Sequence, residues 1–437
     1  MPIPSLMSYQ DAVAGFRAGS DTPRDFLERV VDRLSDWEPR LRAFAALALP
    51  RARLAADAAT ERWRTGSPLS AIDGMPVGVK DVIDAFDLPT AAGTVALEGF
   101  RPRHDSAAVH ALRDAGAAVV GKTKTTELAL TYPTDTRNPH DPRRTPGGSS
   151  SGSAAAVGAG VLPVALGTQA IGSVLRPASF CGTYGYKPTY GAINRGGTRD
   201  FHSQSCLGFL GAGLADVWYS TVSVAERAGG DPGYAALTGG ALPAARAPRA
   251  VVLLDTEGAS EQARSQLDGF AAAAGVPVLD RRNHDGVDRL EKELAGALAK
   301  GRDIINYESR WLVDALTAQD PTGVSAALRG RIDTIRHLTP ADYQALLDWR
   351  TSLRATFAEV MRDADVVVTL SAPGAAPADL TTTGDATFTV PSSLLGAPAL
   401  SLPLFEEDGL PVGLQLVAAQ REDERLFAVA RWAAGVV

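Results

Sequence analysis

The arrangement that most restricts the fold of this chain is an alternation of helix-like segments with short apolar runs. Apolar side chains recur at helical spacing, among charged residues, over roughly the first sixty positions: Phe16, Phe26, Val30, Val31, Leu34, Leu41, Phe44 and Leu47. Residues 75–86 then have the pattern of a strand that enters a loop. Residues 104–130 have that of a helix, a turn at Gly116, a strand over 117–120, a loop and another helix. This alternation predicts an α/β architecture.

The second half of the chain continues the alternation. A stretch rich in Gly, Pro and Ala covers residues 229–249, an apolar strand is predicted at 250–255, and a helical region extends to residue 362. The last predicted elements are strands at 364–370, 396–404 and 410–419 and an amphipathic helix at 421–437. No internal repeat and no long low-complexity linker separates these segments. We therefore predict a single domain over residues 1–437, with a variable helical insert at 230–360.

Composition excludes several classes of function. With 45% hydrophobic and 21% charged residues, the chain resembles an ordinary globular protein. Its net charge of −7 gives no basic excess, so a nucleic-acid partner is not expected. The two cysteines and six histidines show no spacing typical of a metal site or of a disulfide framework. No segment has the pattern of a signal peptide or of about 18 uninterrupted apolar residues, so we expect no membrane partner and a cytoplasmic location.

A tract of Gly, Ser and Ala at residues 145–161, "TPGGSSSGSAAAVGAGV", allows three interpretations. A flexible linker is the first, since Gly/Ser tracts are commonly mobile. The tract continues into the apolar segment 154–167, which has the pattern of a buried helix followed by a strand, and this disfavours a linker. The other interpretations are a phosphate-binding loop and part of an active site.

A literal match to the phosphate-loop motif lies nearby, at "GAAVVGKT", residues 116–123. The motif requires a strand before its first glycine and a loop whose N–H groups surround the phosphate. Here the apolar strand falls between the two glycines, where that loop would have to be. The match is therefore interpreted as accidental, and Lys122 as a residue at the end of a strand.

A serine active site would need a base for its nucleophile. No convincing Ser–His pattern of the α/β-hydrolase kind is present, and the alternative is a lysine base, as in Ser–Lys systems. Lys80 is the candidate, because it lies in the apolar run "PVGVKDVI" and burial lowers the pKa of a lysine. From these residues alone, a structural lysine paired with Asp81 is the favoured interpretation, and the base is the alternative.

Several segments together resemble the amidase signature family of serine hydrolases. They are "GMPVGVKDVID", "GAAVVGKTKTTELAL", "PGGSSSGSAAAVGAG", "LGTQAIGSVLRPASFCGTYGYKPTYG", "ADVVVTLSAPGAAP", "FTVPSSLLGAPALSLPL" and "GLPVGLQLVAA", in this order. The resemblance covers most of the chain. It implies an α/β fold in which a central mixed, mostly parallel, twisted β-sheet is covered by helices on both faces, and it favours Lys80 as a base.

The resemblance also implies a Ser–Ser–Lys triad. Carried over by motif, Ser173 is the nucleophile, Ser149 the bridging serine that follows a cis peptide bond, and Lys80 the base. Neutral Lys80 would take a proton from Ser149 while Ser149 takes one from Ser173, and Ser173 would attack the carbonyl carbon to form an acyl-enzyme. The expected activity is hydrolysis of an amide C–N bond, with esters and carbamates as further candidate substrates.

Further site residues follow from the same motifs. Backbone N–H groups of the loop from Ala170 through Ile171 and Gly172 are expected to form the oxyanion hole. Gly148, Ser150 and Arg176 are expected to contact the substrate, a small-molecule amide that reacts with water. No metal and no cofactor are expected, and a homodimer is considered as the assembly.

Three positions depart from the common family pattern. Gln169 stands where the family usually has Asp, and the arginine has moved by one place to Arg176. These features resemble a malonamidase-like branch, in which this arginine holds a substrate carboxylate; a structural ion pair is the alternative for Arg176. Ile171 stands where the family usually has Gly, and a β-branched residue restricts the backbone and adds bulk beside the oxyanion.

Two other functions remain open from the sequence. The first is the amidase component of a tRNA-dependent amidotransferase, which would need a protein partner and would release ammonia from glutamine. The second is a catalytically inactive binding protein that has kept the amidase fold, for which Ile171 is the supporting feature.

Overall fold

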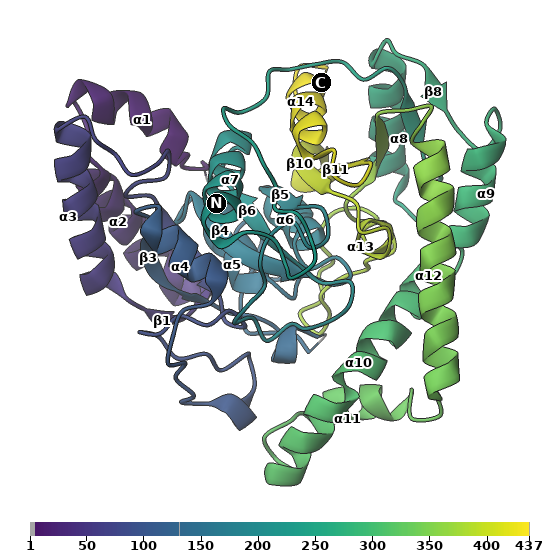
Figure 1. Cartoon of the computed structure of the whole chain (residues 1–437), viewed down its shortest axis with the longest axis horizontal. Coiled ribbons are helices and arrows are strands. Elements are labelled where there is room, and N and C mark those ends of the chain that lie inside the picture. The colour runs from purple at the N-terminus through teal and green to yellow at the C-terminus, as the bar shows by residue number, and fades with distance from the viewer. Residues whose placement is uncertain (1–4, 131, 437) are drawn as a thin grey trace.

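A single large β-sheet forms the centre of the molecule (Figure 1). The computed structural model describes residues 5–130 and 132–436, and within them eleven strands pair in the order β1-β3-β2-β4-β6-β5-β10-β11-β9-β7-β8. The strands are β1 (Phe44–Leu47), β2 (Pro76–Lys80), β3 (Ala118–Thr123), β4 (Val164–Gln169), β5 (Tyr184–Lys187), β6 (Cys206–Gly211), β7 (Val251–Leu253), β8 (Val278–Leu279), β9 (Val366–Leu370), β10 (Ala399–Glu407) and β11 (Leu410–Ala418).

Helices cover both faces of this sheet. They are α1 (Tyr9–Ala18), α2 (Pro23–Leu41), α3 (Leu49–Arg64), α4 (Ala107–Asp114), α5 (Ser151–Gly158), α6 (Leu175–Cys181), α7 (Leu214–Ala228), α8 (Glu261–Ala273), α9 (Asp285–Leu294), α10 (Ala297–Gln319), α11 (Ala326–Asp333), α12 (Pro340–Val360), α13 (Val390–Leu394) and α14 (Asp423–Ala433), with the 3-10 turns η1 (Val95–Leu97) and η2 (Glu127–Ala129). Helices α5 and α6 pack on each other and on the sheet, while α7 packs on β6 and also on α4. The predicted α/β fold, a mixed sheet between helices, is thereby confirmed.

The expectation that parallel strands prevail in the sheet is wrong. Among the described strands, four pairings are parallel and six are antiparallel. Two short strands that the sequence analysis did not recognise, β5 and β6, pair with each other and join the parallel strands β2, β3 and β4 to the hairpin of β10 and β11. Antiparallel pairs are common there, because β5 and β6, like β10 and β11, follow each other along the chain and lie side by side in opposite directions.

Most predicted elements appear near their expected positions. The three late strands are β9, β10 and β11, and the final amphipathic helix is α14. The first sixty residues are not all helical, however, because Phe44 and Leu47 lie in the edge strand β1. A four-residue strand between two helices is too short to show a period of two, and its apolar residues continue the helical spacing of α2.

The Gly/Ser/Ala tract is part of the core. Helix α5 is buried along its whole length, and β4, which follows it, is buried as well. A linker is therefore excluded. The phosphate-loop interpretation is excluded too, since Lys122 lies within β3 and forms a buried ion pair with Asp81, at 3.0 Å.

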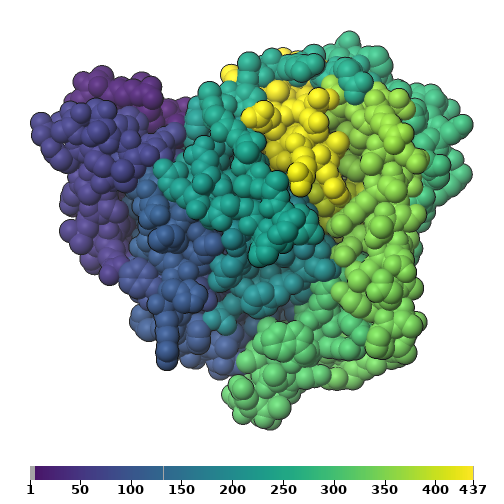
Figure 2. All heavy atoms as spheres, in the orientation of Figure 1, coloured from purple at the N-terminus to yellow at the C-terminus, as the bar shows by residue number. Residues whose placement is uncertain are grey.

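The predicted insert, residues 230–360, contains helices α8 to α12, and α10 to α12 line one side of the molecule in Figure 2. It also contains the short strands β7 and β8, and β7 pairs in parallel with β9 at the end of the central sheet. Throughout the described residues, every helix is too short or too polar to cross a membrane.

Candidate active site

Lys80 ends β2 and points into the protein interior. Its Nζ lies 2.7 Å from Ser149 Oγ and 2.8 Å from Thr168 Oγ1, and the Thr168 carbonyl oxygen is 3.4 Å away. All three residues are buried. The structure therefore brings together two of the three predicted triad residues. The alternative pairing of Lys80 with Asp81 does not occur, since Asp81 pairs with Lys122 on the neighbouring strand.

Burial lowers the pKa of Lys80 to about 7, because an ammonium group loses its hydration there. The negative charge of Asp200 acts in the opposite direction and raises this pKa. Asp200 itself is buried, and its pKa lies well below its usual range. Burial raises this pKa, but His202, Lys80 and the Thr168 side chain together lower it by more than burial raises it. Near neutral pH, a substantial fraction of Lys80 is therefore neutral and able to accept a proton.

A buried polar chain continues behind Asp200. His202 Nδ1 lies 2.6 Å from Asp200 Oδ1, and His202 Nε2 lies 2.6 Å from Ser309 Oγ on α10. Ser309 in turn donates to the carbonyl of Ile305 in its own helix, at 2.6 Å. These side chains link Asp200, whose charge acts on the candidate base Lys80, to helix α10. They orient Asp200, since the histidine occupies one of its oxygens.

The predicted cis peptide is present between Gly148 and Ser149. The carbonyl on each side of it has a donor: Arg176 Nη2 donates to Gly148 O at 2.7 Å, and Thr126 N donates to Ser149 O at 3.1 Å. A Cβ on Gly148 would lie 2.7 Å from the methyl group of Thr383. Gly148 is thus required by the close approach of its neighbours.

The other serines of the tract contact backbone. Ser151 Oγ donates to Gly147 O at 2.8 Å, and Ser150 Oγ donates to Thr168 O at 3.4 Å. Both side chains are buried. These bonds hold the loop that carries Ser149, and contact of Ser150 with a substrate stays a prediction.

Ser173 lies in the turn between β4 and α6. Gln169 holds this turn, because its Oε1 accepts from Val174 N at 2.9 Å and from Leu175 N at 3.0 Å. These are N–H groups at the start of α6 that have no partner in the helix. Within the described part of the chain, Ser173 Oγ has no hydrogen bond and the residue is partly exposed, so the hydroxyl is free to meet a substrate.

Arg176 braces the loop that carries Ser149. It is buried, its Nε donates to Thr383 O at 2.7 Å, and burial lowers its pKa to about 10. The structure describes no carboxylate within ion-pairing distance of Arg176, so the structural ion pair considered from the sequence is replaced by bonds to backbone oxygens. A contact of Arg176 with a substrate carboxylate stays a prediction.

Ile171 fits the backbone of its loop. Its φ lies outside the left-handed region, so the site does not require a glycine for conformational reasons. Gly172 is different, since a Cβ there would lie 2.1 Å from Thr389 Oγ1. The restriction expected from a β-branched residue at 171 therefore causes no backbone conflict.

Three residues around the site were missed from the sequence: Thr168, Asp200 and Gln204. Each becomes a site residue through contacts with distant parts of the chain, so local pattern could not reveal it. The polar run "TRDFHSQS", residues 198–205, offered one signal, because it combines Asp, His and Gln just before an apolar strand.

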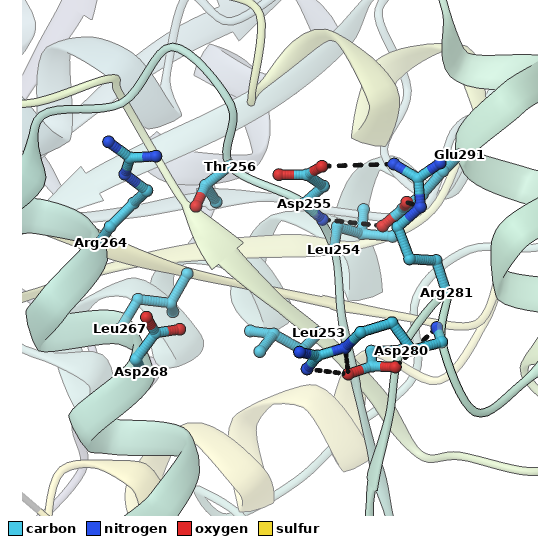
Figure 3. A pocket seen from close by; sticks show the side chains of 11 residues that line it. Leu253, Leu254, Asp255, Thr256, Arg264, Leu267, Asp268, Asp280, Arg281 and Glu291 are labelled. Atoms are coloured by element: carbon cyan, nitrogen blue, oxygen red, sulfur yellow. Dashed lines mark hydrogen bonds and ion pairs between the residues drawn. The ribbon is translucent and has the colours of Figure 1, made fainter.

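The pocket drawn in Figure 3 lies elsewhere, between β7, β8, α8 and α9, and no predicted site residue lines it. Its charged side chains are largely paired with one another. Arg281 Nη1, for example, is 3.4 Å from Asp255 Oδ2, and Arg282 is bonded to Asp280.

Comparison with known proteins decides the family. The family described as Amidase matches residues 25–247 and 293–427. The chain belongs to the amidase family. It is therefore an amide hydrolase. Residues 248–292, which lie between the two matched ranges, hold β7, α8, β8 and most of α9.

Individual relatives agree with this assignment. The chain is 31% identical to the A subunit of the glutamyl-tRNA(Gln) amidotransferase of Chloroflexus aggregans, over 94% of this chain and 92% of that protein. A solved structure described as an amidase superposes with a TM-score of 0.85, at 28% identity, over 98% of this chain and 99% of that one. A chain from a vestigial protein complex that reveals the origins of an s-triazine catabolic enzyme gives a TM-score of 0.87, at 26% identity and 98% coverage of each chain.

Proposed function

We propose that this amidase hydrolyses the C–N bond of a small-molecule amide through an acyl-enzyme on Ser173, with Ser149 as the bridging serine and Lys80 as the base. The observation that carries the proposal is the buried contact of 2.7 Å between Lys80 Nζ and Ser149 Oγ, together with a lysine pKa of about 7. A buried lysine of this kind serves as a general base.

Each proton has a defined route in this mechanism. Lys80 takes the proton of Ser149 as Ser149 takes that of Ser173, and Ser173 Oγ bonds to the carbonyl carbon. The negative charge passes to the carbonyl oxygen, which backbone N–H groups stabilise. The C–N bond then breaks, the proton returns to the leaving amine, and water cleaves the ester of Ser173 by the same route in reverse. Esters and carbamates fit this chemistry as further substrates.

A panel of chromogenic amides, esters and carbamates tests the proposal. Wild-type protein is compared with Ser173→Ala, and with Ser67→Ala as an exposed control serine outside the site. We expect turnover by wild type and by Ser67→Ala, and none by Ser173→Ala. A fluorophosphonate should label wild type at Ser173, as located by mass spectrometry. Equal turnover by wild type and Ser173→Ala would contradict the proposal.

The amidase component of an amidotransferase is a second candidate. It is supported by the curated relatives, which belong to glutamyl-tRNA(Gln) amidotransferases and share about a third of their residues with this chain. Gln169 weakens this candidate, because its Oε1 and Nε2 are both hydrogen-bonded within the protein. Release of ammonia from glutamine, together with co-purification of partner proteins, would favour it. The native mass of the purified protein would at the same time test the predicted homodimer.

A further inference from the structure

The loop between β4 and α6 presents three consecutive backbone donors without acceptors. The N–H groups of Ile171, Gly172 and Ser173 have no hydrogen-bond partner among the residues that the structure describes. Backbone N–H groups shielded by protein are almost always paired, so an unpaired row of them indicates a place for a ligand oxygen. The direction in which these N–H groups point depends on the contacts that fix the peptide units of the loop.

The first peptide unit is held at its carbonyl by Gln204. Gln204 is fully buried in the segment before β6, and its Nε2 donates to Ala170 O at 2.9 Å. The peptide between Ala170 and Ile171 is trans, and in a trans unit the C=O and the next N–H point in opposite directions. A side chain that fixes Ala170 O on one side therefore aims Ile171 N–H to the other side.

The second peptide unit is held in the same way from another element. Ser393, buried in α13, donates from its Oγ to Ile171 O at 3.3 Å. Ser393 is itself oriented by Gln169, whose Nε2 donates to Ser393 Oγ at 3.2 Å. By the geometry of the trans peptide, this contact aims Gly172 N–H away from α13.

Gln204 also connects the loop to the helical segment. Its Nε2 lies 3.5 Å from Gly301 O in α10, and its Oε1 accepts from Arg350 Nη1 of α12 at 3.4 Å. A Cβ on Gly301 would lie 3.4 Å from Ile171 Cδ1, so the isoleucine side chain packs on the same turn of α10. The helical segment thus supports both ends of the first peptide unit.

We propose that Gln204 and Ser393 are positioning residues that hold the Ala170–Ile171 and Ile171–Gly172 peptides so that their N–H groups converge on the oxyanion. This inference rests on the proposed acyl transfer at Ser173. Rotation of either peptide plane would replace a donor by a carbonyl oxygen, which repels the developing negative charge. Each anchor acts on the transition state, since the charge on the carbonyl oxygen arises only there.

Ser393→Ala and Ser392→Ala form a matched pair that tests the second anchor. The two serines are neighbours, both are buried, and both accept from Gln169 Nε2, Ser393 at 3.2 Å and Ser392 at 3.4 Å. They differ in the acceptor of their own hydroxyl, because Ser392 Oγ donates to Thr389 O at 2.9 Å and not to a carbonyl of the oxyanion loop. We expect Ser393→Ala to lower kcat about 10-fold at unchanged KM. This loss is smaller than the roughly 100-fold or larger loss that follows removal of an oxyanion donor, because the variant keeps the N–H group and loses only its anchor. Ser392→Ala should change kcat less than twofold and should keep most of the wild-type thermal stability.

Gln204→Met and Gln204→Glu test the first anchor. Gln204→Met removes the donor at similar size, whereas Gln204→Glu keeps the contact with Arg350 and places a carboxylate oxygen against Ala170 O. We expect both to lower kcat at least about 10-fold with little change in KM, and the loss to be larger for Gln204→Glu. Binding of a boronic acid, which forms a tetrahedral adduct on Ser173, should weaken by a similar factor as kcat.

The outcomes separate this inference from the proposed function. If fluorophosphonate fails to label Ser173 in the wild type, the proposed function is wrong. If wild type is labelled but the Gln204 and Ser393 variants equal it in kcat and boronate affinity, the positioning inference alone is overturned. A merely structural role would reduce substrate binding, boronate binding and melting temperature together, and this result would overturn the inference as well.

Discussion

Lys80 Nζ lies 2.7 Å from Ser149 Oγ, and both residues are sealed from solvent. Three positions far apart in the sequence produce this contact: the end of β2, the loop before α5 and Thr168 near the end of β4. Because β2 and β4 pair in parallel, their carboxyl ends meet at one edge of the sheet. Lys80, the proposed base, thus lies at the edge where an open α/β sheet most often carries its active site.

The pH dependence of activity should follow Lys80. A base must be neutral to accept a proton, and the pKa of Lys80 is lowered to about 7. We expect kcat/KM to rise with pH through about 7 and then level off. Lys80→Met should lower kcat/KM by roughly 100- to 10,000-fold, as for the loss of a general base. A rate that is constant from pH 5 to pH 9 in the wild type would exclude this role.

Asp200→Asn should move the acidic limb of this profile. The groups that face Lys80 are Ser149, Thr168 and the Asp200 carboxylate, and His202 stands behind Asp200. The carboxylate raises the pKa of Lys80, so its removal lowers that pKa further and shifts the limb to lower pH. Glu226→Gln, at an exposed site, makes the same change in net charge and should leave the limb in place. A shift to higher pH would contradict this assignment.

Features set by a local sequence pattern could be predicted from the sequence, whereas features set by contacts between distant residues could not. The strands around β10 and β11 were predictable, because their apolar runs are long and bounded by Gly and Pro. The strand β5 was not, since it has only four residues and one of its partners, β10, lies far along the chain. Lys80 was recognisable as a buried charge. Gln204 was not, because nothing in its neighbourhood shows that it reaches Ala170.

Arg176→Met should destabilise the protein and reduce activity on every substrate. Arg176 donates to Gly148 O and Thr383 O, and its loss would leave buried acceptors unpaired. An unpaired buried acceptor costs about 1–3 kcal/mol. Urea unfolding and kcat on a neutral and an acidic amide are the measurements, with exposed Arg143→Met as the control. If stability is unchanged and only the acidic amide is affected, Arg176 holds a substrate carboxylate instead.

Gly172→Ala should reduce activity through a steric conflict. Its new Cβ would lie 2.1 Å from Thr389 Oγ1 and 3.0 Å from Thr389 Cβ, so the loop or α13 must move. We expect a loss of about 1–3 kcal/mol of stability, as in other overpacked sites. Combining Gly172→Ala with Thr389→Ala removes the nearer atom and should recover part of the loss. Additive effects in the double variant would show that the two sites do not interact.

Ile171→Gly would restore the residue that the amidase signature family usually has, yet it should not raise kcat. Ile171 has an ordinary φ, its N–H remains available, and its side chain packs against α10 at Gly301. A glycine there increases the entropy of the unfolded chain and loses this packing, so unfolding should become easier by at least about 1 kcal/mol. Ile171→Val, which keeps the β-branch, should cost about 1 kcal/mol at most. A higher kcat in Ile171→Gly at unchanged stability would show that the isoleucine obstructs the oxyanion site, as its bulk first suggested.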